Sequence, residues 1–394
     1  KYQIVLMLTK NIDLKNFKKP KKSKNIKKIF SKIKKDFNSK SDLFLISLSN
    51  EYHNTFNIDK LKKYKKFNHY TIIGMGGSSL GAKAIYSFFK EKIKKKFKFI
   101  DNLGIKDFKK IEKKNLNIVI SKSGNTLETI VNFNLLKNYK NSIFISEKKE
   151  NYLRQIASKL KKEIFRHQNF IGGRYSVLSE TGMLPAFLMG LNIKNFKRLN
   201  YLINDKKFEN NLIYNVSSIL DLYNKKKSNS IILNYDENSN DLFLWYQQLV
   251  AESLGKNSKG ILPVISTMPK DNHSLMQLYL DGKKNNFFTL FLVEEKSKNR
   301  LNKKNLSGDY SFLSNKNSFD VIKAQFLATQ NVFNRKKIPF RSFIINQRSE
   351  KVLGELFTYF MLETMMLGKA LNINPFDQPE VELIKKETYK ILKI

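Results

Sequence analysis

The chain has 394 residues, enough for two or three domains of ~150 residues, and hydrophobic residues make up 41% of it. With only 16 Gly and 7 Pro, its composition excludes a collagen, a low-complexity linker and a mainly disordered chain. The absence of cysteine excludes a disulfide scaffold, a thiolate nucleophile, a zinc ribbon and an iron–sulfur cluster, while a formal net charge of +39 suggests an anionic partner.

Residues 1–50 form a basic N-terminal segment. Apolar side chains recur at helical spacing between Ile26 and Phe37, which predicts a basic amphipathic helix. Such a helix either lies on a membrane surface or packs against the body of the protein, and we favour packing. The sequence has no run of about 18 apolar residues, and the stretch from Ile4 to Leu8 is too short for a signal peptide. We therefore expect no membrane partner and a cytoplasmic protein.

The next part of the chain alternates between short apolar runs and helical patterns. Strands are expected at 70–74, 117–121 and 142–146, and helices at about 80–90, 126–138 and 152–162. Strand–loop–helix units of this length predict a parallel sheet with helices on both faces. We assign residues 51–200 to this first α/β/α domain.

A second series of the same kind follows a polar, Lys/Asn-rich segment at 194–227, which suits a domain boundary. Strands are expected at 230–235, 262–265, 287–293 and 342–345, with helices between them. This second α/β/α domain spans 225–365. A long helix is expected at about 349–371, and a loop at 374–378 and a last helix to Ile394 make up a C-terminal segment, 366–394. The predicted fold class is therefore α/β, with two α/β/α sandwich domains and a helical C-terminal segment.

A glycine-rich loop, 74–81, lies between the first strand and its helix, where open parallel sheets bind ligands. It is not a dinucleotide fingerprint, because position 79 is serine, and it is not a P-loop, because Lys83 stands between two alanines. Its main-chain N–H groups and the hydroxyls of Ser78 and Ser79 could contact an anion. A tight turn without a ligand explains the glycines equally well.

The loop 121–126 follows the next strand and opens a helix. It contains three hydroxyl side chains and the ammonium of Lys122, together with the free N–H groups of a helix start. This combination predicts a phosphate site, whereas a helix cap would need only one such residue. Two loops of this kind in one sheet favour a phosphorylated sugar over a nucleotide.

Four further segments place polar residues among apolar neighbours. They are Gly172–Ser176, a helix with Gln248 and Glu252 four residues apart, 271–275 with His273, and 374–379 followed by Lys385. Together with the two loops, these segments resemble the glucose-6-phosphate isomerase (phosphoglucose isomerase) family, in the family's order, from about residue 71 to 385. The resemblance implies a sugar-isomerase type of fold, an enzyme without cofactor or metal, and a homodimer.

The resemblance also implies roles for individual residues in an aldose–ketose isomerase that exchanges glucose 6-phosphate and fructose 6-phosphate. Glu252 is the expected base, Arg174 stabilises the enediolate, and His273 opens the sugar ring with help from Lys385. His273 is expected to come from the partner subunit. The expected substrate-binding residues are Gly77, Ser78, Ser121, Lys122, Ser123, Thr126, Gln248 and Gln378. Lys385 and Lys386 are adjacent, and the spacing from Phe376 favours Lys385 as the site lysine.

Two other classes of function remain as alternatives. A phosphosugar-binding protein without catalysis would keep the hydroxyl-rich loop, but it would not need Arg174, Glu252, His273 and Lys385 together. A nucleic-acid-binding protein would explain the charge, yet only eight of the 73 basic residues are arginines. A solvated lysine surface is the simpler interpretation, and we expect no nucleic-acid partner.

Overall fold

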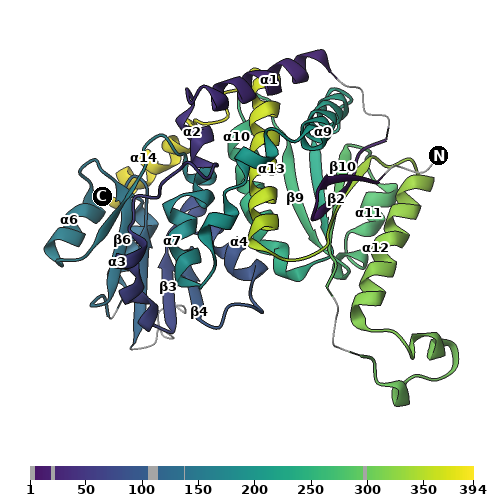
Figure 1. Cartoon of the computed structure of the whole chain (residues 1–394), viewed down its shortest axis with the longest axis horizontal. Helices are drawn as coiled ribbons and strands as arrows, with labels where there is room; N and C mark the ends of the chain where they lie inside the picture. Colours follow the sequence, from purple (N-terminus) through teal and green to yellow (C-terminus); the bar gives the residue numbers. More distant parts are fainter. Residues whose placement is uncertain (1–4, 19–22, 105–113, 137, 296–299) are drawn as a thin grey trace.

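The computed structural model describes residues 5–18, 23–104, 114–136, 138–295 and 300–394. Two sheets lie beside each other, and helices cover their faces (Figure 1). The long helix α13 (Glu350–Ala370), whose side chains are almost all buried, runs between the two halves. This architecture is the predicted α/β fold with two mainly parallel sheets and C-terminal helices.

The first sheet has five parallel strands in the order β4-β3-β5-β6-β7. The strands are β3 (His69–Ile73), β4 (Lys96–Ile100), β5 (Asn115–Ile120), β6 (Ser142–Glu147) and β7 (Ile164–His167). The helices of this half are α4 (Leu80–Phe88), α5 (Leu127–Asn134), α6 (Tyr152–Lys159) and α7 (Glu180–Leu188). The predicted strands and helices are confirmed with shifts of a few residues at their ends, whereas β4 and β7 were not predicted.

The second sheet has six strands in the order β1-β2-β11-β10-β8-β9. The strands are β1 (Val5–Thr9), β2 (Ile12–Lys15), β8 (Asn229–Asn234), β9 (Leu262–Thr267), β10 (Asn286–Val293) and β11 (Phe340–Ile345). The four strands from β8 to β11 are parallel, as predicted. Their helices are α10 (Asn240–Leu254), α11 (Met276–Asp281) and α12 (Ser318–Arg335).

The N-terminal segment is part of this second half of the molecule. The hairpin β1–β2, for which the sequence predicts no strands, adds to the sheet by antiparallel pairing of β2 with β11. Helix α1 (Lys24–Asn38) buries Ile26, Phe30, Ile33 and Phe37 and packs against α13. The expectation that this basic helix packs onto the body of the protein is confirmed.

The segment 194–227, expected to be a polar boundary, is largely helical. It contains α8 (Leu199–Leu202) and the 19-residue α9 (Lys206–Asn224), which packs against α13 and β1. Helix α9 buries the apolar residues Phe208, Leu212 and Val216, and it also buries polar residues such as Asn211 and Asn215. The remaining helices are α2 (Leu43–Ser47), α3 (Ile58–Lys62) and α14 (Val381–Leu392). Among the described residues, no helix combines the length and apolar character needed to cross a bilayer.

Candidate active site

The glycine-rich loop after β3 fits closely against two neighbouring elements. A Cβ on Gly77 would lie 2.2 Å from the carbonyl carbon of Gly173, and one on Gly76 would lie 2.6 Å from the amide nitrogen of Gln248. Gly76 also has a φ of +54°, which favours glycine. These glycines are therefore required for close packing of the loop against α10 and the 3₁₀ helix Gly173–Leu178. The next residue, Ser78, is half-buried beside these two helices.

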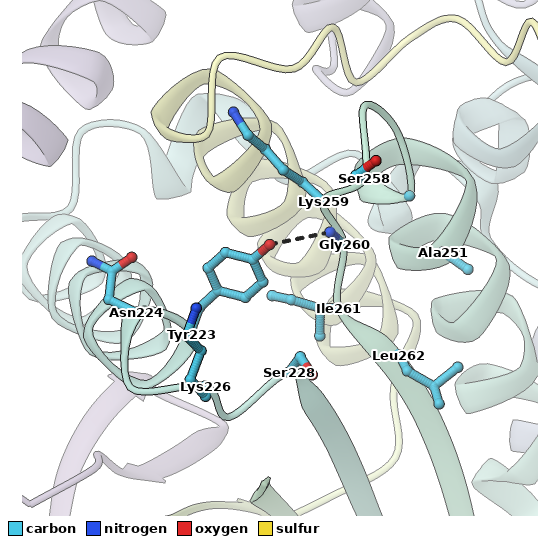
Figure 2. Close-up of a pocket in the computed structure, with 11 residues that line it drawn as sticks. Tyr223, Asn224, Lys226, Ser228, Ala251, Ser258, Lys259, Gly260, Ile261 and Leu262 are labelled. Carbon is cyan, nitrogen blue, oxygen red and sulfur yellow. Dashed lines mark hydrogen bonds between the residues drawn. The ribbon is translucent and has the colours of Figure 1, made fainter.

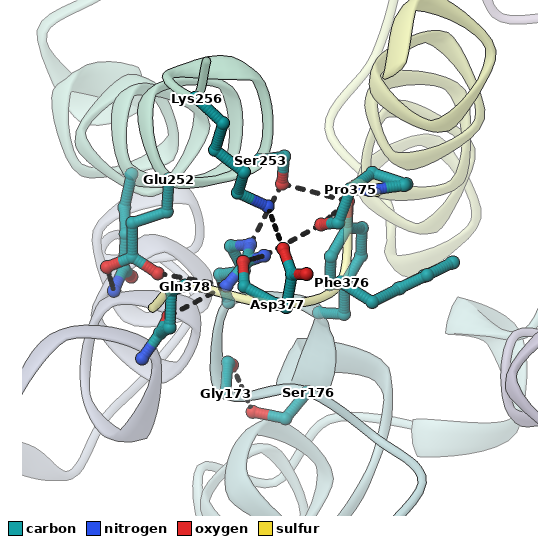
Figure 3. A network of polar contacts seen from close by, with 12 residues as sticks. Gly173, Ser176, Glu252, Ser253, Lys256, Pro375, Phe376, Asp377 and Gln378 are labelled. Carbon is teal, nitrogen blue, oxygen red and sulfur yellow. Dashed lines mark hydrogen bonds and ion pairs between the residues drawn. The ribbon is translucent and has the colours of Figure 1, made fainter. Parts of the chain in front are cut away.

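Arg174, in this 3₁₀ helix, is the centre of a polar network and is only 2% exposed (Figure 3). Its Nε donates to Ser253 Oγ at 2.8 Å, and its Nη1 donates to Glu252 Oε2 at 3.2 Å and Gln378 Oε1 at 2.8 Å. Nη2 donates to the main-chain oxygens of Pro375 at 2.7 Å and Asp377 at 3.0 Å. All five N–H donors of the guanidinium are thus bound within the protein.

Glu252 lies on the face of α10 that also carries Gln248, as the four-residue spacing predicts. Gln248 Nε2 donates to Glu252 Oε1 at 2.8 Å, while Arg174 binds the other carboxylate oxygen. The side chain of Glu252 is 28% exposed, so solutes can reach it. The structure therefore brings together four predicted site residues, Arg174, Gln248, Glu252 and Gln378, from three separate parts of the sequence.

The hydroxyl-rich loop 121–126 follows β5, which pairs directly with β3, so the two predicted anion loops are neighbours at one edge of the sheet. Ser121 Oγ lies 2.8 Å from Thr126 Oγ1, and Ser123 Oγ accepts a hydrogen bond from Asn125 N at 3.3 Å. Thr126 directly precedes α5 but makes no capping hydrogen bond with its side chain. The helix-cap alternative therefore does not explain this threonine.

Lys122 in this loop turns its ammonium toward the chain that follows β7. Its Nζ donates to the main-chain oxygen of Asn169 at 2.8 Å, and burial lowers the pKa of Lys122. The neighbouring His167 is buried, and its Nε2 has no hydrogen-bond partner among the described residues. Burial lowers the pKa of His167 to about 4, with the charge of Lys122 acting in the same direction.

The remaining two predicted catalytic residues lie outside the Arg174 network. His273 is exposed and lies between β9 and α11 in the chain, and α11 and α14 lie on opposite sides of α13 in Figure 1. Lys385 lies on α14, where its Nζ pairs with Glu382 at 2.6 Å. The same helix meets the predicted phosphate loop, since the Tyr389 hydroxyl donates to the main-chain oxygen of Asn125 at 3.4 Å.

Several residues of the network were not predicted as site residues. Ser253 lies near the end of α10, Lys256 lies just after it, and Asp377 lies in the loop 374–378, but none of the three was given a role. The main-chain oxygens that bind Arg174 have no signature in the sequence. The same loop is held by Phe376, whose ring packs against Phe44 with a centroid distance of 5.4 Å.

A separate hollow of about 660 Å³ lies where β8 and β9 begin and is lined by Tyr223, Lys259 and neighbouring residues (Figure 2). In it the Tyr223 hydroxyl accepts a hydrogen bond from Gly260 N at 3.4 Å. None of its lining residues carries a carboxylate, so it offers no counterpart of Glu252. In parallel sheets ligands bind at the carboxyl ends of the strands, which is where the Arg174 network lies. Among the described residues, no cluster of His, Asp or Glu is arranged to hold a metal ion.

Comparison with known proteins gives a consistent result. The model of the family "Phosphoglucose isomerase" matches residues 52–268. A glucose-6-phosphate isomerase of Methanocaldococcus jannaschii is 33% identical, over 86% of this chain and 87% of its own. One of Mycoplasmoides gallisepticum is 31% identical, over 92% of this chain and 97% of its own. The chain belongs to the phosphoglucose isomerase family.

Solved structures share the fold of this chain. A hypothetical protein of Thermus thermophilus aligns with a TM-score of 0.79 and 25% identity, over 92% of this chain and 94% of its own. A glucose-6-phosphate isomerase of Chlamydia trachomatis aligns with a TM-score of 0.69 and 21% identity, over 85% of this chain and 72% of its own. The span matched by the phosphoglucose isomerase model contains Arg174, Glu252 and the loop 121–126, whereas His273, Gln378 and Lys385 lie beyond its end.

Proposed function

We propose that this protein interconverts glucose 6-phosphate and fructose 6-phosphate by moving a proton between two adjacent carbons through an enediol(ate). The observation that carries the proposal is the pairing of an accessible carboxylate, Glu252, with the buried guanidinium of Arg174 at 3.2 Å. A base beside a fixed positive charge is what proton abstraction next to a carbonyl requires.

In this mechanism Glu252 takes the proton from C2 and returns it at C1. Its two carboxylate oxygens are held by different neighbours, Gln248 and Arg174, so its orientation is set before the sugar binds. The same carboxylate serves both half-reactions, because the proton leaves one carbon and returns to the next.

Arg174 supplies the positive charge for the enediolate. Both N–H groups of Nη2 are bound by main-chain oxygens, which argues against a guanidinium that presents its whole fork to the substrate. A substrate oxygen could replace the side chain of Gln378 or Glu252 at Nη1 only. We therefore propose that Arg174 acts chiefly through its charge. In a buried site, the electrostatic attraction between this charge and the enediolate is substantial even at a separation of several ångströms.

The phosphate group is assigned to the loop 121–126, with Ser121, Lys122, Ser123 and Thr126 as its ligands. Hydroxyls, an ammonium and the N–H groups at the start of α5 suit a phosphate dianion. Gly77, Ser78, Gln248 and Gln378 are assigned to the sugar. Because the phosphate is remote from the reacting carbons, this grip supplies positioning rather than chemistry.

We further propose a cytoplasmic homodimer that acts in glycolysis and gluconeogenesis, with His273 of one chain opening the sugar ring in the site of the other. The exposure of His273, and its position just before α11, which lies on the far side of α13 from α14, support a role toward a partner. Lys385 is assigned to the sugar hydroxyls, and the contact of α14 with the loop 121–126 supports that assignment.

The direct test is a coupled assay that measures glucose 6-phosphate formed from fructose 6-phosphate by the purified protein, with and without a chelator. We expect turnover that a chelator does not change. Binding of the phosphosugar without turnover would favour a non-catalytic binding protein, and an absence of both would overturn the assignment.

A further inference from the structure

The orientation of Arg174 depends on one short loop. Of the five acceptors that bind its guanidinium, three belong to the loop 374–378: the main-chain oxygens of Pro375 and Asp377 and the side chain of Gln378. A displacement of this loop would therefore leave buried N–H donors without acceptors and would also move Gln378.

The loop is in turn held by Lys256, which follows the C-terminal end of α10. Lys256 Nζ lies 2.6 Å from Asp377 Oδ1 and also donates to the main-chain oxygen of Asn374. The Lys256 side chain is only 10% exposed, although Asp377 is 52% exposed. Asn374 supports the same arrangement by donating from Nδ2 to Asp377 Oδ2 at 3.0 Å.

Lys256 comes from the same stretch of chain as the proposed base. Glu252 lies four residues before it, and Ser253 binds Arg174 Nε directly. The end of α10 thus carries the carboxylate of Glu252 and binds Arg174 Nε through Ser253. It also supports Arg174 Nη2 indirectly, because Lys256 holds the loop whose main-chain oxygens accept from Nη2. Figure 3 shows the side chain of Lys256 reaching from the end of α10 to the carboxylate of Asp377.

We propose that Lys256 and Asp377 form a positioning pair that holds the loop 374–378 against Arg174 and thereby keeps Arg174 and Gln378 in their reactive arrangement. The inference rests on the isomerase function proposed above. The pair acts through Arg174 and Gln378 and does not itself contact the reacting atoms, so its loss should slow the chemical step more than it weakens substrate binding.

Kinetics of single variants test this role. Lys256→Met keeps the aliphatic stem and loses the charge, and we expect kcat to fall about 10–100-fold with KM changed by less than about threefold. Lys256→Arg should restore most of kcat. Asp377→Asn should lower kcat in the same way, and it serves as the second variant if Lys256→Met does not fold.

Lys259→Met is the matched control. Lys259 lies three residues further along, is exposed, and donates to the main-chain oxygen of Leu371 at 2.9 Å, away from the Arg174 network. Its kcat should stay close to that of the unmodified protein. The double variant Lys256→Met/Asp377→Asn should lose little more than the worse single variant, because both remove one interaction. A kcat for Lys256→Met equal to that of the control, or multiplicative losses in the double variant, would overturn the proposal.

A second measurement needs no turnover. Hydrogen exchange of the main-chain amides in 374–378 should be faster in Lys256→Met than in Lys259→Met, measured at temperatures where both are fully folded. Unchanged exchange in this loop would show that Lys256 does not hold it. If the unmodified protein turned over no sugar, the proposed function would fail, whereas the exchange experiment would still decide whether the pair holds the loop.

Discussion

At the scale of single residues, the site is arranged around groups that are fixed by hydrogen bonds before a substrate is present. Glu252 is the clearest case, because Gln248 and Arg174 each bind one of its oxygens. A base held in this way loses little conformational entropy on reaching the transition state, and this lowers the activation barrier.

Replacing Glu252 by Gln should lower kcat by ~10³-fold or more with little change in KM, because the amide keeps the size of the side chain but cannot accept the proton. Exchange of the C2 proton of the sugar with solvent should stop in parallel, and proton NMR in deuterated buffer measures this directly. Turnover close to normal in the variant would mean that another group is the base.

Ser123→Ala and Thr126→Ala should weaken binding of the phosphorylated sugar and of inorganic phosphate. Each change removes one charge-assisted hydrogen bond, worth ~1.5–3 kcal/mol, or about 10–100-fold in affinity. Calorimetric titration with phosphate measures the effect without catalysis. Equal affinities in both variants and the unmodified protein would contradict the assignment of this loop to phosphate.

His167 should make the stability of the protein depend on pH. Its pKa is lowered to about 4 in the folded protein from an ordinary value of 6.5, so between these values the unfolded chain binds a proton that the folded protein does not. The contribution is fully present above pH 6.5 and is lost as the pH falls toward 4. At pH 5 we expect a loss of roughly 2 kcal/mol relative to pH 7.

Urea unfolding at pH 5 and pH 7 measures this dependence. Carboxylates also titrate in this range, so the informative quantity is the difference between the unmodified protein and His167→Gln, in which the histidine term is absent. His53→Gln, at an exposed histidine, should leave the dependence as it is in the unmodified protein. A His167→Gln variant with the same pH dependence would contradict the prediction.

The sequence predicts the site residues that act through distinctive side chains better than those that act through main-chain atoms. Glu252 and Gln248 are predictable because their spacing on a helix puts them on one face, and Arg174 because it follows two glycines before an apolar helix. Lys256 was not recognised because it is one of many lysines in this chain. Pro375 was not recognised because its contribution is a main-chain oxygen, which every residue has.

At the scale of secondary structure, apolar runs with β-branched residues predict strands well, as β5 and β10 show. The strands β2 and β4 escaped prediction because they are short and interrupted by lysines or an aspartate at half-buried or exposed positions. Helix α9 was taken for a boundary because it is rich in polar residues, yet the structure buries several of them, among them Asn211, Asn215 and Ser217. Its buried face is evident only once the sheet that it covers is known.

One buried ion pair should be essential for joining β11 to α13. Arg341 is fully buried, and its Nη2 lies 3.0 Å from Glu363 Oε2, while its Nε donates to Thr289 Oγ1 at 3.0 Å. Glu363→Gln would leave a buried guanidinium without its counter-charge, at a cost of about 3–5 kcal/mol in the free energy of unfolding.

Chemical denaturation measures this effect. Glu387→Gln is the control, since Glu387 pairs with Lys390 on the exposed face of α14. Exposed pairs of this kind contribute little, so the control should unfold at the same denaturant concentration as the unmodified protein. If the two variants were equally stable, Arg341 would have found another partner.

At the scale of the whole molecule, the proposed dimer predicts that active sites are shared. Glu252→Gln chains and His273→Ala chains, each inactive alone, should regain activity when unfolded and refolded together in equal amounts. A mixed dimer would contain one site with both changes and one site with neither. Random pairing makes about half of the dimers mixed, so about a quarter of normal activity should return.

The two chains can be given different affinity tags, so that formation of mixed dimers is measured independently of activity. Mixed dimers without activity would mean that Glu252 and His273 of the same chain serve one site, and the shared-site proposal would then be wrong.

The antiparallel pairing of β2 with β11 also determines when the second sheet can be completed during protein synthesis. Leu14 and its partner Phe343 are more than 300 positions apart in the chain. At about 5–20 residues per second, the hairpin leaves the ribosome tens of seconds before its partner strand exists. The first sheet, whose strands all lie between His69 and His167, is translated completely within that interval. Until β11 has been made, Ile12 and Leu14, both buried in the folded protein, lack the sheet against which β2 pairs, and the hairpin β1–β2 offers a hydrophobic target to a ribosome-associated chaperone.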